Sequence, residues 1–243
     1  MLPEPLGAPS AGPPDDTSDE YPYYEETVTE SDWHFEAQEA LRFALENRYA
    51  GVPDVYVASN MFVYYEKGDR DKKVSPDTFV VLGAPRRRHK SYRIWEEGQP
   101  PAVVFEFTSE SSKVTDRGTK KAIYEIMGVR EYFLFDPLGE YIPGQLKGYR
   151  AQSGELLPMV GRELISEVLG IRLKPEDFLL RVYDAASGEP YLTPRESEQA
   201  RREAEQARRE AEQARREAEQ ARREAERRAE ALEAELRRIR GAE

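Results

Sequence analysis

The chain contains no cysteine and only two histidines among its 243 residues. The absence of cysteine excludes a disulfide scaffold, a thiolate zinc site and a cysteine nucleophile, and two histidines are too few for a histidine-rich metal site. No apolar run approaches the ~20 residues that span a bilayer, and the N-terminus lacks the basic and apolar regions of a signal peptide. We therefore expect a soluble, cytoplasmic protein whose chemistry depends on carboxylates, lysine, serine or tyrosine.

Positive charge is missing from the first 32 residues, which carry nine carboxylates and neither Lys nor Arg. Residues 195–243 hold fourteen acidic and fourteen basic side chains, so almost all of the net charge of −11 comes from the N-terminus. This distribution predicts a disordered acidic tail over 1–28, one domain over 29–194 and a separate segment over 195–243. The ordinary interpretation of the tail is a solubilising leader, and the alternative is an arm that mimics DNA.

The central stretch alternates between helical and strand-like patterns. Capping residues from Thr29 to Asp32 precede a helix that ends near Asn47, whose apolar stripe we expect to be Phe35, Ala37, Leu41, Ala44 and Leu45. Further along, the patterns predict a hairpin of Val52–Val57 with Met61–Tyr65, strands at Thr78–Leu82, Ala102–Thr108 and Glu131–Phe135, a helix over Lys113–Gly128, and a polar hairpin that begins at Lys147–Arg150. This order predicts an α/β fold with a sheet covered by helices.

The C-terminal segment repeats EQARREA four times from Glu198 to Ala225. Its alanines recur in steps of four and three, which is typical of the seam of a heptad coiled coil, and pairs such as Glu198 with Arg202 and Glu205 with Arg209 lie four residues apart with Glu first. The pattern predicts a long helix. Because an alanine seam buries little area, we expect a homodimer or a weak homo-oligomer; a solvated single helix is the alternative.

Two carboxylates stand out against their apolar surroundings. In Ala102–Thr108 the alternation places Val104, Glu106 and Thr108 on one face, while Asp77 directly precedes the strand Thr78–Leu82. A carboxylate inside a strand is costly to bury unless it is paired or binds a metal. If the two acids meet at neighbouring strand ends, their oxygens suit Mg²⁺ or Mn²⁺.

A lysine on the following helix is a third candidate. Lys120 shares a helical face with Ile123, Tyr124 and Met127, so it points towards the sheet, whereas Lys121 faces water. A lysine beside two metal-binding carboxylates can orient the attacking water and offset charge on a phosphoryl transition state. Asp116 lies one turn earlier, and a plain salt bridge between Asp116 and Lys120 is the alternative.

These motifs together resemble a known family. Ser75-Pro76-Asp77, Val104 to Ser109, Asp116 to Lys120 with Tyr124, and Gly128 to Pro137 are similar to the Uma-type restriction endonucleases of the PD-(D/E)XK nuclease superfamily. The resemblance covers about residues 30–190. It implies a restriction-endonuclease-like core, in which helices flank a central mixed sheet, with Mg²⁺ bound by Asp77, Glu106 and the backbone carbonyl of Phe107. Thr108 stands where the superfamily has its lysine; in this family the lysine is displaced to the next helix, which matches Lys120.

The resemblance also suggests accessory residues. Glu36 or Glu39 on the first helix, and His34 near its start, are candidates, although an exposed surface histidine is the alternative for His34. The dense basic run Arg86, Arg87, Arg88 and Lys90, followed by Arg93, is a candidate DNA-binding surface, with a solvated loop as its alternative.

The sequence thus predicts a Mg²⁺-dependent endonuclease that hydrolyses DNA, with Asp77, Glu106 and Lys120 as catalytic residues. The rival interpretation is an inactive nuclease fold that self-associates, or binds a partner, through its coiled coil.

Overall fold

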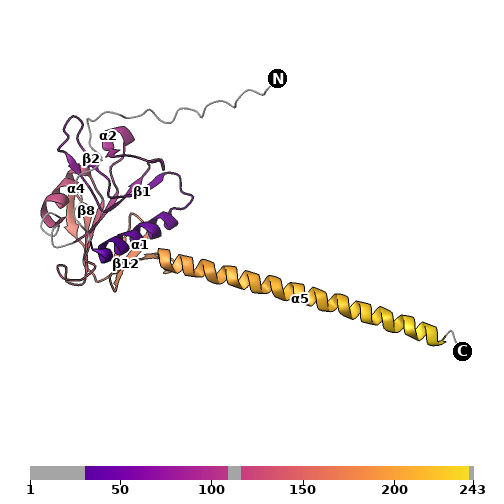
Figure 1. The fold of residues 1–243 in the computed structure, drawn as a ribbon. Helices are drawn as coiled ribbons and strands as arrows, with labels where there is room; N and C mark the ends of the chain where they lie inside the picture. Colours follow the sequence, from indigo (N-terminus) through magenta and orange to yellow (C-terminus); the bar gives the residue numbers. More distant parts are fainter. Residues whose placement is uncertain (1–30, 109–115, 241–243) are drawn as a thin grey trace, which may run out of the picture. The chain divides into compact units, whose positions relative to one another are not determined.

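The structure is a computed structural model that describes residues 31–108 and 116–240. The chain divides into two units between Tyr191 and Leu192. Figure 1 shows the elements of the first unit, which combines helices with three sheets, and the single long helix of the second. No helix among the described residues is both long and apolar enough to cross a membrane.

The largest sheet has six strands in the order β1-β4-β6-β7-β8-β9. Only β6 and β7 run parallel; all other neighbours in this sheet are antiparallel. A parallel pair requires a crossover, and the chain between β6 and β7 supplies it through η1 and α4. The bounds are β1 Val55–Ser59, β4 Thr78–Leu82, β6 Val103–Phe107, β7 Glu131–Phe135, β8 Leu146–Gln152 and β9 Glu155–Pro158; η1 is Asp116–Lys120 and α4 is Lys121–Met127.

Two smaller sheets and two further helices complete the first unit. The sheets have the orders β3-β2-β5 and β10-β11-β12. Their bounds are β2 Val63–Tyr64, β3 Lys73–Val74, β5 Tyr92–Arg93, β10 Leu164–Ser166, β11 Ile171–Glu176 and β12 Leu179–Asp184; the helices are α1 Asp32–Arg48 and α2 Ile94–Glu97. The predicted α/β fold with a central mixed sheet is therefore confirmed.

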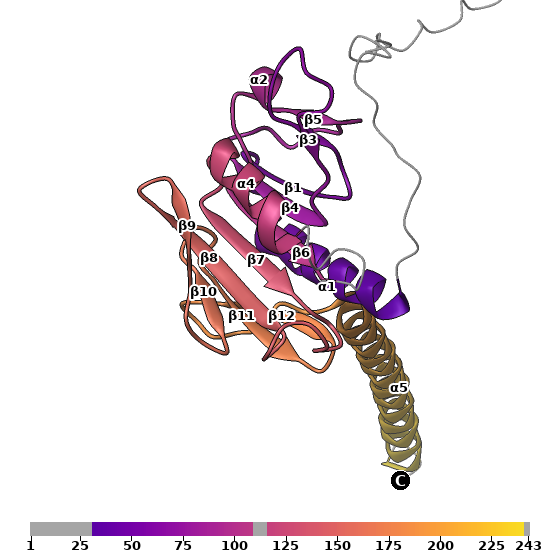
Figure 2. The same cartoon turned by 90° about the vertical axis from the view of Figure 1, so that its left-hand side faces the viewer.

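The two faces of the central sheet carry separate apolar clusters. Along β6, Val103, Phe105 and Phe107 join the cluster that contains α1 and the β10-β11-β12 sheet, whereas Val104 joins the cluster that contains α4 and the β3-β2-β5 sheet. Figure 2 shows α4 on one face of the sheet and α1 on the other. The predicted alternation of this strand is confirmed, and it directs Glu106 to the α4 face.

Helix α1 begins where the capping residues predict, because the Ser31 side chain accepts a hydrogen bond from the His34 amide. The buried stripe of this helix begins at His34, one position before the predicted Phe35. Phe35 is 61% exposed, while His34 and Gln38 are buried with Ala37, Leu41 and Leu45. The buried positions follow i, i+3, i+4 and i+7 from His34, so Phe35 lies about 100° away around the helix.

The predicted hairpin of Val52–Val57 with Met61–Tyr65 is wrong. β1 pairs with β4 over five residue pairs, and β2 pairs instead with β3 and β5. Ala58 and Ser59, which we expected in a turn, extend β1 opposite Phe79 and Thr78. The longer apolar partner at β4 decides the pairing. The polar hairpin expected from Lys147 is present as β8 and β9.

The helix expected over Lys113–Gly128 is observed in part. Residues 109–115 lie outside the described chain, Asp116–Lys120 form the π-helical turn η1, and α4 follows and ends at Gly128 in the left-handed conformation. π-Helical turns are rare and are frequently found at functional sites.

The second unit is α5, Pro194–Arg240, and the prediction of a long C-terminal helix is confirmed. Predicted Glu–Arg pairs bridge successive turns at 2.5–3.0 Å, with Glu198, Glu205, Glu212 and Glu219 bound to Arg202, Arg209, Arg216 and Arg223. Exposed pairs of this kind are screened by water and each stabilises a helix only weakly, so the helix is supported by many small contributions.

Candidate active site

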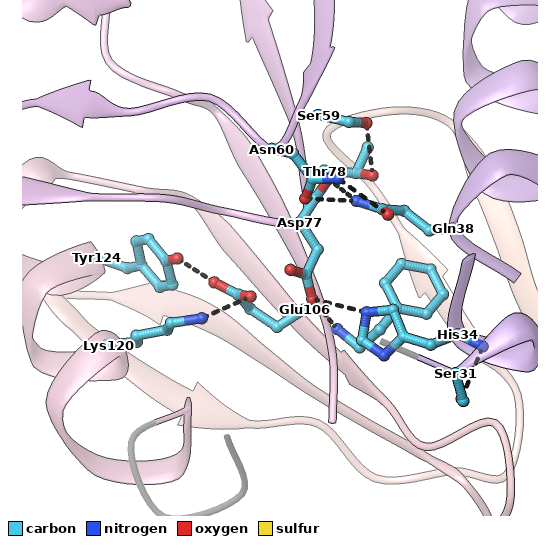
Figure 3. A network of polar contacts seen from close by, with 11 residues as sticks. Ser31, His34, Gln38, Ser59, Asn60, Asp77, Thr78, Glu106, Lys120 and Tyr124 are labelled. Atoms are coloured by element: carbon cyan, nitrogen blue, oxygen red, sulfur yellow. Dashed lines mark hydrogen bonds and ion pairs between the residues drawn. The ribbon is translucent and has the colours of Figure 1, made fainter. Parts of the chain in front are cut away.

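Strand register brings Asp77 and Glu106 together. β4 and β6 are antiparallel, and Thr78 lies opposite Phe105. Asp77, which precedes Thr78, therefore lies next to Glu106, which follows Phe105. The Phe107 amide donates to Asp77 Oδ2 at 2.6 Å, which fixes the carboxylate against the end of β6. Figure 3 shows both carboxylates in the same space, with Lys120 and Tyr124 on one side and α1 on the other. The sequence-based expectation that two strand ends meet here agrees with this geometry.

Glu106 is fully buried and has a partner on each oxygen. Lys120 Nζ lies 2.9 Å from Oε2, and the Tyr124 hydroxyl donates to Oε1. Burial raises the pKa of the Tyr124 phenol well above its usual value of 10, and the negative charges of Glu106 and Asp77 raise it further. Tyr124 therefore stays protonated, and the hydrogen bond that it donates holds the Glu106 side chain in one orientation.

Helix α1 holds the other side of the site. His34 Nε2 is 3.8 Å from Asp77 Oδ2, and the Gln38 amide donates to the Asp77 carbonyl. Gln38 also exchanges two hydrogen bonds with Asn60, at 2.9 and 3.2 Å. Because Gln38 hydrogen-bonds the turn that carries Asp77 and the His34 ring lies near its carboxylate, α1 fixes the position of that turn relative to β6.

The two neighbouring lysines are placed differently. Lys120, at the end of the π-helical turn, points at Glu106 with its side chain 18% exposed. Lys121 instead pairs with Glu125 at 2.5 Å and lies over the Tyr149 ring. The two lysines thus point to different partners, as the helical periodicity predicts, but Lys121 does not face water as expected, because its side chain is only 26% exposed.

The accessory candidates separate in the same way. Glu36 and Glu39 are exposed on α1, so the structure does not bring them to Asp77. His34 is 6% exposed and the ring lies 5.6 Å from that of Phe107, so the alternative of a surface histidine is wrong. The side chain of Asp116 lies outside the described part of the structure. Phe107 lies against Asp77 through its amide, which places its peptide beside the site.

The basic run is only partly an open surface. Arg86, Arg87, Arg88 and Lys90 are exposed, whereas Arg93 has a side chain only 12% exposed and pairs with Glu96 at 3.0 Å. Arg87 also contacts Glu97 at 2.5 Å. Arg93 is therefore a poor candidate for contact with DNA.

Sequence reasoning did not single out Gln38 or Asn60, and it did not assign a role to Tyr124. A signal existed for Gln38, which follows His34 by one helical turn, and for Tyr124, which shares the Lys120 face. Asn60 has a positive φ of 51° at the end of β1, a conformation that asparagine tolerates, but nothing local connects it to Asp77.

A search of curated proteins gave no significant match. Among solved structures the chain is similar to a "putative nuclease belonging to DUF820" from Anabaena variabilis, at 14% identity and a TM-score of 0.44, over 57% of this chain and 73% of that one. The Uma2 family model, described as "Putative restriction endonuclease", matches residues 13–174. Because this match covers well over half of the chain, and Asp77, Glu106 and Lys120 lie within it, the protein belongs to the Uma2 family.

Proposed function

We propose that this protein is a Mg²⁺-dependent endonuclease that hydrolyses DNA phosphodiester bonds. The observation that carries the proposal is the convergence of Asp77 and Glu106 at adjoining ends of β4 and β6, with the Lys120 ammonium 2.9 Å from Glu106. Family membership supports a nuclease. What we propose beyond family membership is the DNA substrate, the Mg²⁺ ion and the roles of the individual residues.

The two carboxylates fit a Mg²⁺ or Mn²⁺ ion. Among the described residues no group of three or more His, Asp and Glu is arranged to hold a metal. Mg²⁺ does not need one, since it keeps several waters and binds one or two carboxylates together with substrate phosphate. A carboxylate has about four acceptor positions, two on each oxygen, of which the Lys120 ammonium and the Tyr124 hydroxyl each take one on Glu106. Asp77, Glu106 and the Phe107 carbonyl would hold the ion, which when bound lowers the pKa of a coordinated water and polarises the phosphate.

The chain's own residues would then position the attacking water and the metal-binding carboxylates, and stabilise the charge of the transition state. Lys120 would orient the attacking water and offset the charge that develops on the phosphoryl oxygens. Tyr124 would keep Glu106 in its binding orientation, because its hydroxyl holds the oxygen that Lys120 does not. His34 and Gln38 would fix Asp77 from the opposite side.

We also infer that α5 sets the oligomeric state, through self-association along its alanine seam. Over residues 199–225 the rest of its surface consists of exposed Glu, Arg and Gln side chains. This role is separate from the chemistry, because Asp77, Glu106 and Lys120 all belong to the first unit.

The test is incubation of the purified protein with plasmid, single-stranded DNA and RNA in the presence of Mg²⁺, Mn²⁺ or EDTA. We expect metal-dependent DNA cleavage that EDTA stops and that Asp77→Asn abolishes without unfolding the domain. Removing one acid relieves repulsion between the two carboxylates, so the variant should fold. Cleavage unchanged in Asp77→Asn would remove this residue from the site. No cleavage under any condition, with self-association intact, would favour an inactive interaction module.

A further inference from the structure

Polar side chains recur at every fourth position along α1. His34 lies 3.8 Å from Asp77 and Gln38 hydrogen-bonds its carbonyl, and Arg42 and Glu46 follow at the next two turns. Arg42 and Glu46 line a cavity of about 460 Å³ at the outer edge of β1. Ser59 lines the same cavity and bonds Thr78, the neighbour of Asp77, at 3.0 Å. The cavity therefore begins beside the candidate active site.

The opposite wall of the cavity is the loop that contains Arg86, Arg87 and Arg88. Two contacts fix this loop to the sheet. The Arg86 amide donates to the Pro53 carbonyl at 3.1 Å, and the His89 ring packs on Tyr56 with ring centres 4.8 Å apart. A ligand would therefore meet arginines whose backbone is already in place, which lowers the ordering cost of binding.

The cavity carries an excess of positive charge. Arg42 pairs with Glu46 at 3.1 Å and Arg87 with Glu97 at 2.5 Å, while the structure gives Arg86 and Arg88 no ion pair within residues 31–108 and 116–240. Guanidinium groups match phosphate oxygens in shape and charge. The class of ligand that this wall favours is a phosphodiester anion.

The helix gives the distance from the candidate active site. Eight residues separate His34 from Arg42, about 12 Å along α1 at a rise of 1.5 Å per residue. Successive phosphates of one DNA strand advance by about 3.4 Å along the duplex axis. For a duplex whose axis runs along α1, the cavity lies about three to four nucleotides from the reacting phosphate.

We propose that this cavity, which we call the arginine pocket, binds a backbone phosphate of the substrate strand three to four nucleotides from the bond that is cut. The proposal rests on the proposed function and adds a second contact point to it. It also assigns Arg42, on a helix far from the basic run in sequence, to the same surface as Arg86 and Arg88.

Binding in EDTA tests the pocket without cleavage. Fluorescence anisotropy with a labelled oligonucleotide would compare wild type with Arg42→Gln and Arg88→Gln, and with Arg162→Gln, an exposed arginine before β10, as the control of equal charge change. We expect each pocket variant to weaken binding about 10-fold and to reduce the slope of log K against log salt by about 1. The control should leave the slope unchanged.

A cleavage experiment locates the phosphate. Neutral methylphosphonates are placed one at a time along a substrate strand, and wild type should lose most activity when the third or fourth phosphate from the cut is neutral. In an Arg42→Gln/Arg88→Gln protein this position should no longer matter more than its neighbours, because the partner has been removed.

The outcomes separate the two proposals. If wild type binds and cuts DNA but the pocket variants behave like Arg162→Gln, the pocket proposal is wrong and the proposed function stands. If wild type neither binds nor cuts any nucleic acid, both fail. If a polyglutamate peptide, and not DNA, binds in a manner that depends on Arg42 and Arg88, the pocket holds an acidic peptide and the phosphate proposal is overturned.

Discussion

Glu106 and Glu131 are two fully buried glutamates on the neighbouring parallel strands β6 and β7. Each pairs with a cation and accepts from a hydroxyl. Glu106 has Lys120 and Tyr124, and Glu131 has Arg150 Nε at 3.0 Å and the Ser166 hydroxyl. The surroundings differ. Glu131 also accepts from the Glu167 amide at 3.0 Å, whereas Glu106 faces a second carboxylate, Asp77.

The comparison shows that burial of a carboxylate does not by itself mark a functional site. Glu131 is surrounded by donors from β8 and from the end of β10, so it ties these elements to β7. Glu106 has Lys120 and Tyr124 among its partners and lies beside the acidic Asp77, whose side chain is 14% exposed and thus within reach of a cation and a substrate. Two acids side by side need a positive charge between them, whereas one acid among donors is already satisfied.

Replacing Glu106 and Glu131 by glutamine, one at a time, should give the largest difference between the two sites. We expect Glu106→Gln to abolish metal-dependent cleavage while the domain stays folded, because the variant loses a proposed metal ligand. Glu131→Gln should retain cleavage per folded molecule but lose about 2–3 kcal/mol of unfolding free energy, since buried donors lose their acceptor. Urea unfolding and plasmid cleavage measure the two effects. Full activity in Glu106→Gln would show that both glutamates are structural.

The two adjacent lysines test whether the partner of Glu106 takes part in cleavage. We expect Lys120→Met to slow cleavage by a factor of ~100 or more, the scale for removal of one preorganised electrostatic group. Lys121→Met should change the cleavage rate only a few-fold, because the Lys121 ammonium pairs with Glu125. Initial rates on a plasmid at fixed Mg²⁺ distinguish the two. Equal losses would mean that the lysines act only as general positive charge.

The two hydroxyls give a smaller contrast. Tyr124→Phe should slow cleavage about 10-fold and raise the Mg²⁺ concentration needed for half-maximal rate, the effect of losing a group that orients a metal ligand. Ser166→Ala should leave both quantities unchanged and lower stability by about 1 kcal/mol. A Mg²⁺ titration of both variants provides the measurement. If Ser166→Ala shifts the Mg²⁺ dependence as much as Tyr124→Phe, the roles of the two glutamates are not distinct.

The raised pKa of Tyr124 adds a pH dependence of stability. The folded state favours the protonated phenol, so its contribution is complete below pH 10, the usual pKa, and is lost as pH rises from there towards the folded pKa. Wild-type stability should therefore decline above pH 10 more steeply than that of Tyr124→Phe. Parallel declines would mean that the hydroxyl is not held in this way.

Deletion after Pro194 should have the smallest effect on the chemistry. Glu106 and Glu131 both belong to the first unit, so cleavage and domain stability should stay as in the full chain. The sedimenting mass should fall to that of a smaller assembly, because the alanine seam is removed. A full-length protein that sediments as a monomer at tens of micromolar would contradict the assembly.

Local periodicity was sufficient where a residue's orientation depends on its own element. Alternation along β6 placed Glu106 on the other face of the strand from Phe105 and Phe107. Helical spacing separated Lys120 from Lys121, and the repeat predicted α5. Each of these patterns is set by the geometry of one strand or one helix, so no distant contact is needed to read it.

Partnership between distant segments was decided only by the tertiary structure. The pairing of β1 with β4, the binding of Gln38 to the Asp77 turn and the approach of Arg42 to the loop at Arg86 all join residues more than fifteen positions apart. The same holds for Glu131, whose role depends on Arg150 and Ser166. The sequence determined which face each side chain occupies, but a period of two or of 3.6 residues carries no information about the partner across the gap. Strand order and helix docking bury the largest apolar area together, and they alone chose those partners.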